Sequence, residues 1–428
     1  MGAADAAAPA TAAGAARVLA RLETLFAIGA GEGANRPGLS AEEEQACALA
    51  AAWMREAGLE VSWDAVGNVV GRLPGAAPDL PEVWAGSHVD TVPAGGRFDG
   101  ALGVVAAIEA VGRLAARAGA GALRRTVGVV VFRDEEGWRF GTGVLGSRAL
   151  AGQLAAGDLD VRDGEGISVG EALAALGRAD LVRDGRVVAV GETPGVFVEA
   201  HIEQGPVLAD ADAPLGVVTS IVGTAGFRVA FAGAAGHAGT TPMAGRADAV
   251  CAAARFALAV RDAATAAGAG VVATVGRIET PGGASNVVPA RVEVTADARA
   301  GDPAVFAALC AAVEHAAAEA AAAEGCTARV RPAGRIEPVP MAAVARAALA
   351  RAVEAAGAPV VEIASGAGHD AQCLAAAGVP AGMLFVRSLA RGVSHRPDEH
   401  TDAEAVGLAV DALEHALADL ADRPDDAA

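Results

Sequence analysis

The sequence contains no tyrosine, and aromatic residues make up only 3% of its 428 residues. It also has few positive charges, since 33 lysine and arginine residues stand against 52 acidic residues and give a formal net charge of −19. This balance argues against a nucleic-acid or anionic membrane surface, because both partners are themselves negatively charged. No uninterrupted apolar run is long enough to span a bilayer. We therefore expect no nucleic-acid partner and no membrane partner.

Cysteine is scarce and scattered, which argues against two further kinds of protein. The five cysteines include no C-x-x-C pair, so the sequence predicts neither a thiolate metal cage nor a disulfide framework. The start of the chain, MGAADAAAPATAAGAA, lacks the basic and apolar regions of a secretory signal. These features favour a cytoplasmic location.

The length predicts more than one domain, because 428 residues exceed the usual size of a single core. Residues 1–217 and 334–428 share a pattern of apolar strands that end in polar loops. Residues 218–333 contain instead two strand pairs, each followed by a long helical stretch, which is typical of a compact α+β unit. We expect an α/β domain with a central, mostly parallel sheet flanked by helices, interrupted by this inserted α+β domain.

Four apolar strands lead into loops that carry histidine and carboxylate side chains. PEVWAGSH runs into the glycine-rich loop after His88, and TVGVVVF runs into the acidic residues Glu135 and Glu136. His201 and His395 lie near the ends of two further strands. Loops at strand ends are where α/β proteins carry their chemistry. These four loops are therefore the candidates for a site.

Eight histidines are present, and five of them lie in loops rich in glycine or acidic residues: His88, His201, His237, His369 and His395. Any one of them, taken alone, is better explained by a structural or solvent-facing role. Together, imidazoles and carboxylates from different strand ends form a nitrogen and oxygen ligand set suited to zinc, manganese or cobalt. The sequence therefore predicts a metal site.

Asp99 is the candidate to bridge two metal ions, since Gly96 and Gly100 allow the backbone to approach the ions closely. The alternative role for Asp99 is a plain helix N-cap. Asp90 stands two residues after His88 and suits a carboxylate that holds the tautomer of that imidazole.

Glu135 and Glu136 leave a strand end in opposite directions, so one can bind metal while the other faces the substrate. We assign Glu136 to the metal and Glu135 to accepting a proton from a bound water. A solvated acidic run is the alternative, but the preceding VGVVVF is typical of a buried strand.

Seven blocks, taken in order, resemble the signature blocks of the hydantoinase/carbamoylase amidases. That group includes N-carbamoyl-L-amino-acid hydrolase, allantoate amidohydrolase and β-ureidopropionase, within the aminoacylase and carboxypeptidase superfamily of two-metal hydrolases. The resemblance covers about residues 16–415. The blocks are GSHVDTVPAGGRFDGALG, DEEGWRFGTGVLGSRAL, EAHIEQGPVL, GHAGTTPM, GGASNVVPARVEVTADAR, SGAGHDAQ and GVSHRPDE.

The resemblance implies two divalent metal ions per subunit, with zinc as the first expectation and manganese, cobalt or nickel as alternatives. It implies His88 and His201 as terminal ligands of one ion, Glu136 and His395 as those of the other, and Asp99 as the bridge. This agrees with the assignment made from the residues themselves.

The resemblance also implies a homodimer in which the inserted domain makes the interface and acts as a lid. His237 would then reach the metal site of the neighbouring subunit and stabilise an oxyanion. Gln204, Asn286 and Arg299 match positions that hold the substrate, and Arg299 would clamp a carboxylate. Glu135 would be the general base. A turn histidine and a surface arginine are the alternatives for His237 and Arg299.

Trp138 stands where that group often has a small residue, and the loop with Arg387 and Arg391 is longer than its counterpart. The expected function is the metal-dependent hydrolysis of the ureido group of N-carbamoyl-L-amino acids, small-molecule substrates that yield an amino acid, carbon dioxide and ammonia. Allantoate amidohydrolase is the first alternative. A metal-binding dimer scaffold without catalysis is the second.

Overall fold

The computed structural model describes residues 3–29, 31–118, 123–178, 182–183, 186–187 and 191–424. These form two compact units. The first consists of Met1–Thr219, Met341–Ile363 and His369–Ala428, and the second of Ser220–Pro340 and Ala364–Gly368. The boundary expected after residue 333 falls inside a strand of the second unit, because that strand continues to Ile336. The short return of residues 364–368 to the second unit was not foreseen.

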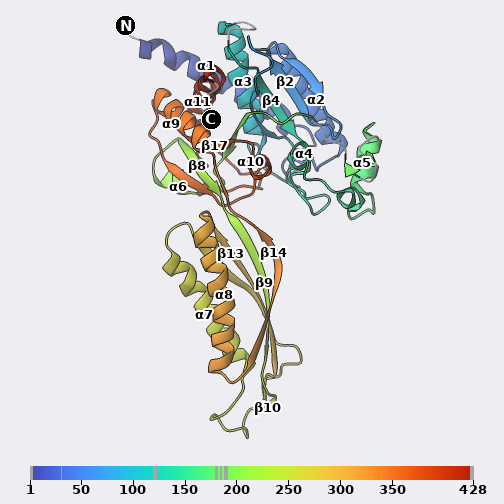
Figure 1. Cartoon of the computed structure of the whole chain (residues 1–428), viewed down its shortest axis with the longest axis vertical. Helices are drawn as coiled ribbons and strands as arrows, with labels where there is room; N and C mark the ends of the chain where they lie inside the picture. The colour runs from blue at the N-terminus through green and yellow to red at the C-terminus, as the bar shows by residue number, and fades with distance from the viewer. Residues whose placement is uncertain are drawn as a thin grey trace. The chain divides into compact units, whose positions relative to one another are not determined.

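The largest sheet has nine strands in the order β1-β2-β4-β3-β7-β17-β8-β15, with β16 paired to β8. Figure 1 labels β2, β4, β17 and β8 of this sheet. Their bounds are β1 Glu60–Trp63, β2 Val69–Leu73, β3 Val83–His88, β4 Val127–Phe132, β7 Val196–Ile202, β8 Leu215–Ile221, β15 Val339–Pro340, β16 Glu362–Ser365 and β17 Ala381–Val386.

The four central strands β4, β3, β7 and β17 run parallel to one another. The outer pairs β1 with β2, β2 with β4, β17 with β8 and β8 with β15 are antiparallel. The α/β class and the helix-flanked central sheet are confirmed, while parallel pairing is confined to the centre of a mixed sheet. Among these antiparallel pairs, β1 and β2 are joined by a short turn of residues 64–68, whereas long stretches of chain separate the members of the other pairs.

The helices of the first unit cover the two faces of this sheet. Alternation along β7 separates the faces: Val198 and Ala200 belong to the core shared with α1, α3, α9 and α11, whereas Glu199 accepts a hydrogen bond from Ala371 of α10 on the other side. The bounds are α1 Ala3–Phe26, α2 Ala41–Glu56, α3 Ala101–Ala118, α4 Leu145–Leu150, α5 Val169–Ala175, α6 Val207–Asp210, α9 Ala343–Ala355, α10 Asp370–Ala376 and α11 Ala403–Asp422. Two short strands, β5 Val182–Arg183 and β6 Arg186–Val187, and a 3-10 helix at Ala156–Asp160 complete this unit.

Helix α2 begins after Ser40, which caps it by accepting a hydrogen bond from the Glu43 main-chain N–H. The side chain of Glu43 does not complete a capping box. Its carboxylate accepts instead from the main-chain N–H groups of Leu39, at 2.6 Å, and Asp134, at 2.9 Å. Glu43, in the first turn of α2, therefore fixes the main chain just after the end of β4.

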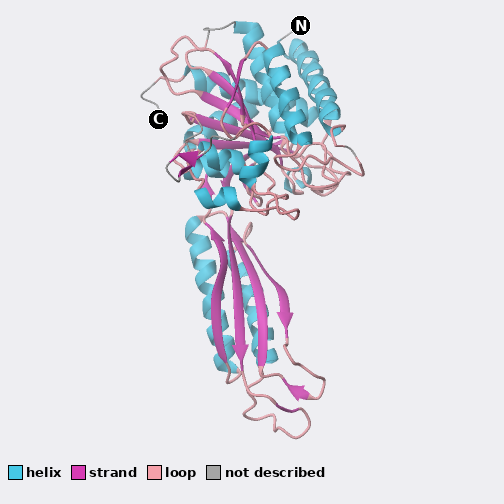
Figure 2. Ribbon diagram, turned by 90° about the vertical axis from the view of Figure 1, so that its right-hand side faces the viewer, coloured by secondary structure: helices cyan, strands magenta, loops and turns pink. Residues whose placement is uncertain are grey.

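The second unit is a four-stranded antiparallel sheet in the order β11-β13-β9-β14, with two helices along one face (Figure 2). Phe227, Phe231, Phe256 and Phe306 form its core with aliphatic neighbours. The bounds are β9 Gly223–Ala232, β10 Gly236–His237, α7 Ala249–Ala267, β11 Val272–Glu279, β12 Val287–Val288, β13 Arg291–Ala300, α8 Pro303–Ala323 and β14 Thr327–Ile336.

The first expected strand pair of this unit is wrong. β8 and β9 do not pair with each other, although only Val222 separates them. β8 pairs with β17 in the nine-stranded sheet, while β9 pairs with β13 and β14. The chain passes from one sheet into the next without a turn, and hydropathy alone could not distinguish this from a hairpin.

Helix α8 is the one helix among the described residues that is long and apolar enough to cross a membrane. Phe306, Leu309 and Val313 of this helix are buried in the core of the second unit. Burial of one side against a sheet is typical of a core helix in a globular domain.

Candidate metal centre

The four loops singled out in the sequence meet at one edge of the nine-stranded sheet. The carboxyl ends of β4, β3, β7 and β17 lie side by side, because these strands are parallel neighbours. His88 is the last residue of β3, His201 lies next to last in β7, and Glu135 follows shortly after β4. Parallel pairing is therefore what brings side chains distant in sequence together.

The first group of potential metal ligands contains His88, Asp99 and His201, all of them buried. Asp99 Oδ1 lies 3.1 Å from His201 Nε2 and 3.7 Å from His88 Nε2. The ligand atoms of the group all lie within 4.8 Å of one another, a spacing in which one cation fits.

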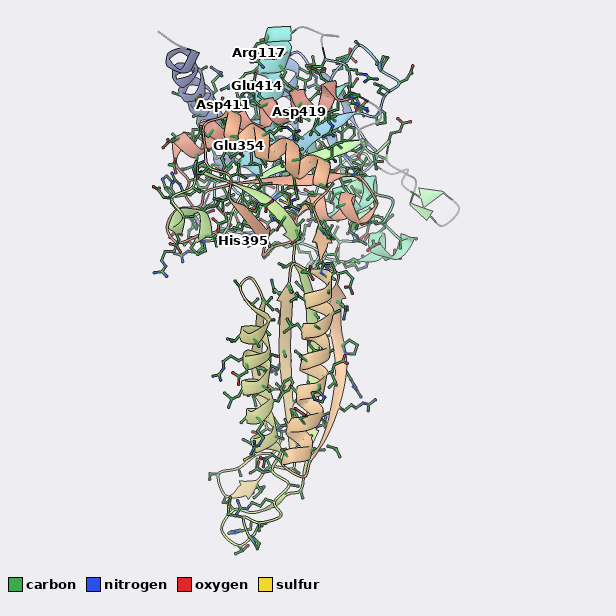
Figure 3. The ribbon with its side chains drawn as sticks, turned by 60° about the vertical axis from the view of Figure 1, so that its left-hand side comes forward. Arg117, Glu354, His395, Asp411, Glu414 and Asp419 are labelled. Carbon is green, nitrogen blue, oxygen red and sulfur yellow. The ribbon has the colours of Figure 1, made fainter. Side chains whose placement is uncertain are left out.

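The second group contains Asp99 again, with Glu136 and His395. His395 Nε2 lies 3.3 Å from Asp99 Oδ2 and 3.3 Å from Glu136 Oε2. The His395 side chain, which Figure 3 labels, is 50% exposed, and its backbone has φ +58°. The two oxygens of Asp99 thus face different groups, as a bridging carboxylate requires.

Both buried imidazoles direct the same nitrogen toward Asp99. His88 Nδ1 lies 3.3 Å from Asp90 Oδ1 and 3.3 Å from Asp90 O, and His201 Nδ1 lies 2.9 Å from Ile202 O. In the neutral rings, a proton on each Nδ1 satisfies these oxygens and leaves the Nε2 lone pair to bind a cation or to accept, as His201 Nε2 does from the Gly100 main-chain N–H at 3.3 Å.

Asp90 also fixes the acidic turn after β4. Its two carboxylate oxygens accept from the main-chain N–H groups of Glu135 and Glu136, each at 3.1 Å. Glu135 Oε2 lies 3.6 Å from His88 Nε2, beside the first ligand group, while Glu136 belongs to the second. The two adjacent glutamates therefore have different neighbours.

Asp99 itself is held by more than imidazoles. Gln204 Nε2 and Ser394 Oγ each donate to Asp99 Oδ2 at 2.8 Å, and Glu399 Oε1 accepts the Asp99 main-chain N–H at 3.0 Å. Gly100, next in the chain, has φ +60°, and a Cβ there would lie 2.4 Å from His88 Nε2. The Asp99 carboxylate accepts from Gln204 and Ser394 and not from the first main-chain N–H groups of α3, so the structure does not show Asp99 as the N-cap of that helix.

The charges of the site depend on one another. Burial opposes ionisation of Asp99, yet hydrogen bonds from His201 and His395 hold the pKa of Asp99 well below its usual value. Burial also opposes a charged His88, but the nearby Glu135 raises its pKa well above 6.5. The hydrogen bond to Asp99 raises the pKa of His395 to about 9. In the absence of cations, protons on the imidazoles balance the carboxylates.

Burial raises the pKa of Glu135 well above its usual value, and it raises that of Glu136 to about 7. Asp99 adds to the shift of Glu136 by repulsion between like charges. Carboxylates crowded in a buried site disfavour their own ionisation unless positive charge is brought in. The site therefore fits divalent cations, which would supply that charge.

Sequence reasoning missed three acidic residues that surround these ligands: Glu199, Asp370 and Glu399. Glu199 accepts from Ser87 Oγ at 2.8 Å and from the main-chain N–H of Ala371. Asp370, which precedes Ala371, is buried, and so is His369, one of the histidines singled out in the sequence. The ring of His369 lies 4.4 Å from that of His201, and burial lowers its pKa well below 6.5, so it is neutral. The signal that could have revealed Glu199 is that it is an acidic residue inside the apolar strand GVFVEAHI. Glu399, which holds Asp99, carried no comparable signal.

His237, Asn286 and Arg299 all belong to the second unit. His237 pairs with Val287 between β10 and β12, next to Asn286. His237 Nδ1 accepts from the N–H groups of Gly239 and Thr240, so the neutral ring carries its proton on Nε2 and can donate it. Arg299 Nε donates to Asp297 Oδ1 at 2.8 Å. The part of these three residues in catalysis stays a prediction.

The two departures noted in the sequence have different environments. Arg387 forms an ion pair with Asp402, with its Nη2 2.9 Å from Oδ2, and so supports the start of α11. Trp138 is 57% exposed, two residues beyond Glu136. It lines an open groove with Leu39, Ile167 and neighbouring polar side chains.

Three comparisons with known proteins agree in finding similarity to one family of hydrolases. Residues 84–419 match the model of peptidase family M20/M25/M40. The N-carbamoyl-L-amino acid amidohydrolase of Geobacillus stearothermophilus is 39% identical over 91% of this chain and 94% of its own length. A probable allantoate deiminase of Oryza sativa is 37% identical over 91% and 86%. The crystal structure of a hydantoinase/carbamoylase family amidase from Burkholderia multivorans matches with a TM-score of 0.86 and 34% identity, over 96% of this chain and 98% of that one.

Proposed function

The chain belongs to peptidase family M20/M25/M40, and within it to the hydantoinase/carbamoylase amidases, hydrolases of carbon–nitrogen bonds, and we propose that it hydrolyses N-carbamoyl-L-amino acids. The observation that carries the proposal is Asp99, whose two oxygens belong to two ligand groups beside the buried carboxylate of Glu135. Relatives named for this reaction are 35–39% identical to the chain.

The residues that would hold two divalent cations are His88, Asp99 and His201 for one, and Asp99, Glu136 and His395 for the other. Cations bound there would lower the pKa of a water molecule and polarise the ureido carbonyl group. Zinc is the first expectation, since the set combines imidazole nitrogen with carboxylate oxygen, and manganese, cobalt and nickel accept the same ligands.

Glu135 would accept a proton from the attacking water and return it to the departing nitrogen. Its position suits both steps, because its main-chain N–H is fixed by Asp90 and its carboxylate lies beside His88. In the overall reaction, one ureido group and one water yield an amine, carbon dioxide and ammonia. Arg299 would clamp the substrate carboxylate, with Asn286 and Gln204 as further contacts.

His237 would donate from Nε2 to the developing oxyanion, as the pattern of hydrogen bonds at its Nδ1 supports. We assign the second unit to a lid and to the interface of a homodimer in which His237 serves the neighbouring subunit. A cytoplasmic location completes the proposal.

Hydrolysis of allantoate is the second candidate, because relatives named allantoate deiminase are 34–37% identical to the chain. Both candidates share the reacting ureido group and differ in the rest of the substrate. The same metal centre would serve either reaction.

The test is ammonia release by metal-reconstituted protein from N-carbamoyl-L-amino acids, N-carbamoyl-β-alanine and allantoate. Glu135→Gln should lower turnover by about 10²- to 10⁴-fold with both cations retained. Glu165→Gln, at an exposed acid, is the matched control and should change nothing. No turnover on any substrate by fully loaded protein would refute the reaction and favour a silent scaffold. Turnover of allantoate alone would select the second candidate.

A further inference from the structure

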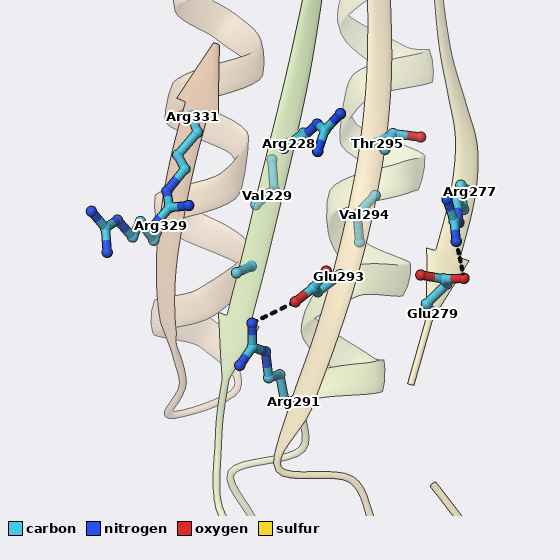
Figure 4. A pocket seen from close by; sticks show the side chains of 11 residues that line it. Arg228, Val229, Arg277, Glu279, Arg291, Glu293, Val294, Thr295, Arg329 and Arg331 are labelled. Atoms are coloured by element: carbon cyan, nitrogen blue, oxygen red, sulfur yellow. Dashed lines mark hydrogen bonds and ion pairs between the residues drawn. The ribbon is translucent and has the colours of Figure 1, made fainter. Parts of the chain in front are cut away.

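One face of the four-stranded sheet in the second unit carries arginines instead of a helix layer. Residues along β9 alternate, so that Phe227 and Val229 are buried against the helices while Arg228 is exposed on the opposite face. Arg329 and Arg331 are exposed on the neighbouring strand β14. These side chains rise from the open face of the sheet (Figure 4).

The register of the strands sets two arginines directly opposite each other. Arg331 of β14 pairs with Arg228 of β9, and on the other side of Arg228 lies Thr295 of β13. Thr295 in turn lies opposite Arg277 of β11. Like charges directly opposite on adjacent strands destabilise a sheet. The Arg228 and Arg331 pair therefore costs stability unless a negative charge lies between them.

Glutamates of this face neutralise two other arginines. Arg277 forms an ion pair with Glu279, and Arg291 Nη2 lies 2.5 Å from Glu293 Oε1, as the dashed lines of Figure 4 show. Both pairs join residues two apart on one strand. The acids of this face are thus already engaged by their own strand neighbours.

The guanidinium groups of Arg228, Arg329 and Arg331 have no hydrogen bond and no ion pair with any residue that the structure describes. The hollow they line has a volume of about 350 Å³, and its lining includes five arginines and two glutamates. It is a local concentration of positive charge on a chain whose net charge is −19.

We propose that this hollow binds phosphate groups, held between Arg228 and Arg331 with Thr295 as a further donor. The planar fork of each guanidinium matches two oxygens of a phosphate, and a tetrahedral dianion can accept from forks on two different strands. A single carboxylate carries only one charge and would neutralise only one of the two arginines. The site is independent of the metal centre and of the proposed reaction.

The first test is calorimetric titration of the metal-free full-length protein with inorganic phosphate, pyrophosphate and a nucleoside triphosphate at constant ionic strength. Pyrophosphate should bind more tightly than phosphate. Arg228→Gln and Arg331→Gln should each weaken binding by about tenfold, and the double variant should not bind. Arg261→Gln is the matched control, since Arg261 is exposed on α7 of the same unit and pairs with Asp262. Its affinity should equal that of the unaltered chain.

The second test measures the unfolding temperature, which the two substitutions should raise although they abolish anion binding. Without anion, the double variant should unfold at a higher temperature than the unaltered chain, because the repulsion is gone. Pyrophosphate should raise the unfolding temperature of the unaltered chain and leave that of the double variant unchanged. Absence of binding to the unaltered chain, or equal binding by the double variant, would overturn the proposal. A response to the nucleoside triphosphate but not to inorganic anions would assign the site to a phosphorylated metabolite.

Discussion

The main-chain N–H of Asp134 donates to Glu43 Oε1 at 2.9 Å, and this bond ties the start of α2 to the turn that carries Glu135 and Glu136. Since Asp90 accepts the next two N–H groups, three consecutive N–H groups end on two buried carboxylates. Asp134 has φ +49°, a conformation that costs free energy and persists only where the surroundings enforce it. The position of the acidic turn therefore depends on charges outside the ligand set.

Replacement of Glu43 by glutamine should be strongly destabilising. Arg133, fully buried, has its Nη2 2.8 Å from Glu43 Oε2, so the variant leaves a buried cation with only Glu44 as an anionic partner. Breaking a buried ion pair costs about 3–5 kcal/mol of unfolding free energy. Denaturant unfolding of the metal-free protein measures it. Asp419→Asn, in an exposed pair with Arg351, is the control and should change little. Equal small losses in both variants would contradict the role given to Glu43.

The variant Asp90→Asn should lose affinity for cations. An asparagine can accept through one oxygen only, so one main-chain N–H of the acidic turn would face an amide NH2 group instead of an acceptor, and His88 would lose its carboxylate neighbour. We expect a decrease in metal affinity of about 10- to 100-fold, measured by titration of metal-free protein. Asp64→Asn is a matched control, because Asp64 Oδ1 accepts from the N–H groups of Gly67 and Asn68 in a turn of the first unit. If both variants bound cations as the unaltered chain does, Asp90 would not be a positioning residue.

Protons and cations should compete at His395. Its pKa is raised to about 9 in the metal-free protein, chiefly by the hydrogen bond to Asp99, so binding of a cation near neutral pH must release a proton. Cation affinity should therefore rise with pH between about 6.5 and 9. The stability of the metal-free protein should move the other way: the contribution of His395 is complete below 6.5 and is lost as pH rises through its folded-state pKa.

Titrations of cation and of denaturant at several pH values measure both trends. His395→Gln should flatten them, whereas His315→Gln, at an exposed position on α8, should leave them unchanged. A cation affinity that did not vary with pH would mean that no ligand is protonated in the metal-free state.

Mixing two inactive variants tests whether His237 acts across a dimer. One subunit carries Glu135→Gln and the other His237→Ala, so each mixed dimer contains one site with both groups intact. Random reassortment should restore about a quarter of the unaltered activity. Size-exclusion measurements should show dimers in each preparation. Dimers that reassort and stay inactive would place His237 outside the neighbouring site.

The candidate site was accessible to sequence reasoning because its ligands lie at the ends of apolar strands or in the loops that follow them. The strand VGVVVF ahead of Glu135 and Glu136 is buried throughout, as expected, and the four strand ends meet because their strands are parallel neighbours. Glycines mark close approaches in the same way, and Gly100 leaves room for His88. Local pattern and chain topology agree here, since the side chains singled out in the sequence come together in two groups.

The surroundings of the site were less accessible. Glu43 stands three residues after Ser40, which is the spacing of a capping box. Its carboxylate accepts instead from the main-chain N–H of Asp134, which is too far away in the sequence for a local pattern to predict the contact. The pairing of β9 was predicted wrongly for the same reason. β9 pairs with β13 and β14, because tertiary packing determines strand partners and the alternation of a single segment does not.

The chain first leaves the first unit after Thr219 and returns to it at Met341. The Met341 N–H donates to Thr219 O at 2.9 Å, so the residues that flank the long excursion through the second unit are hydrogen-bonded neighbours. A short turn could join them without altering the pairing of β17 with β7 or with β8. Such an architecture is that of one domain inserted into the chain of another, and an exchange of the insert would have to allow for residues 364–368, which the second unit takes from a later part of the chain.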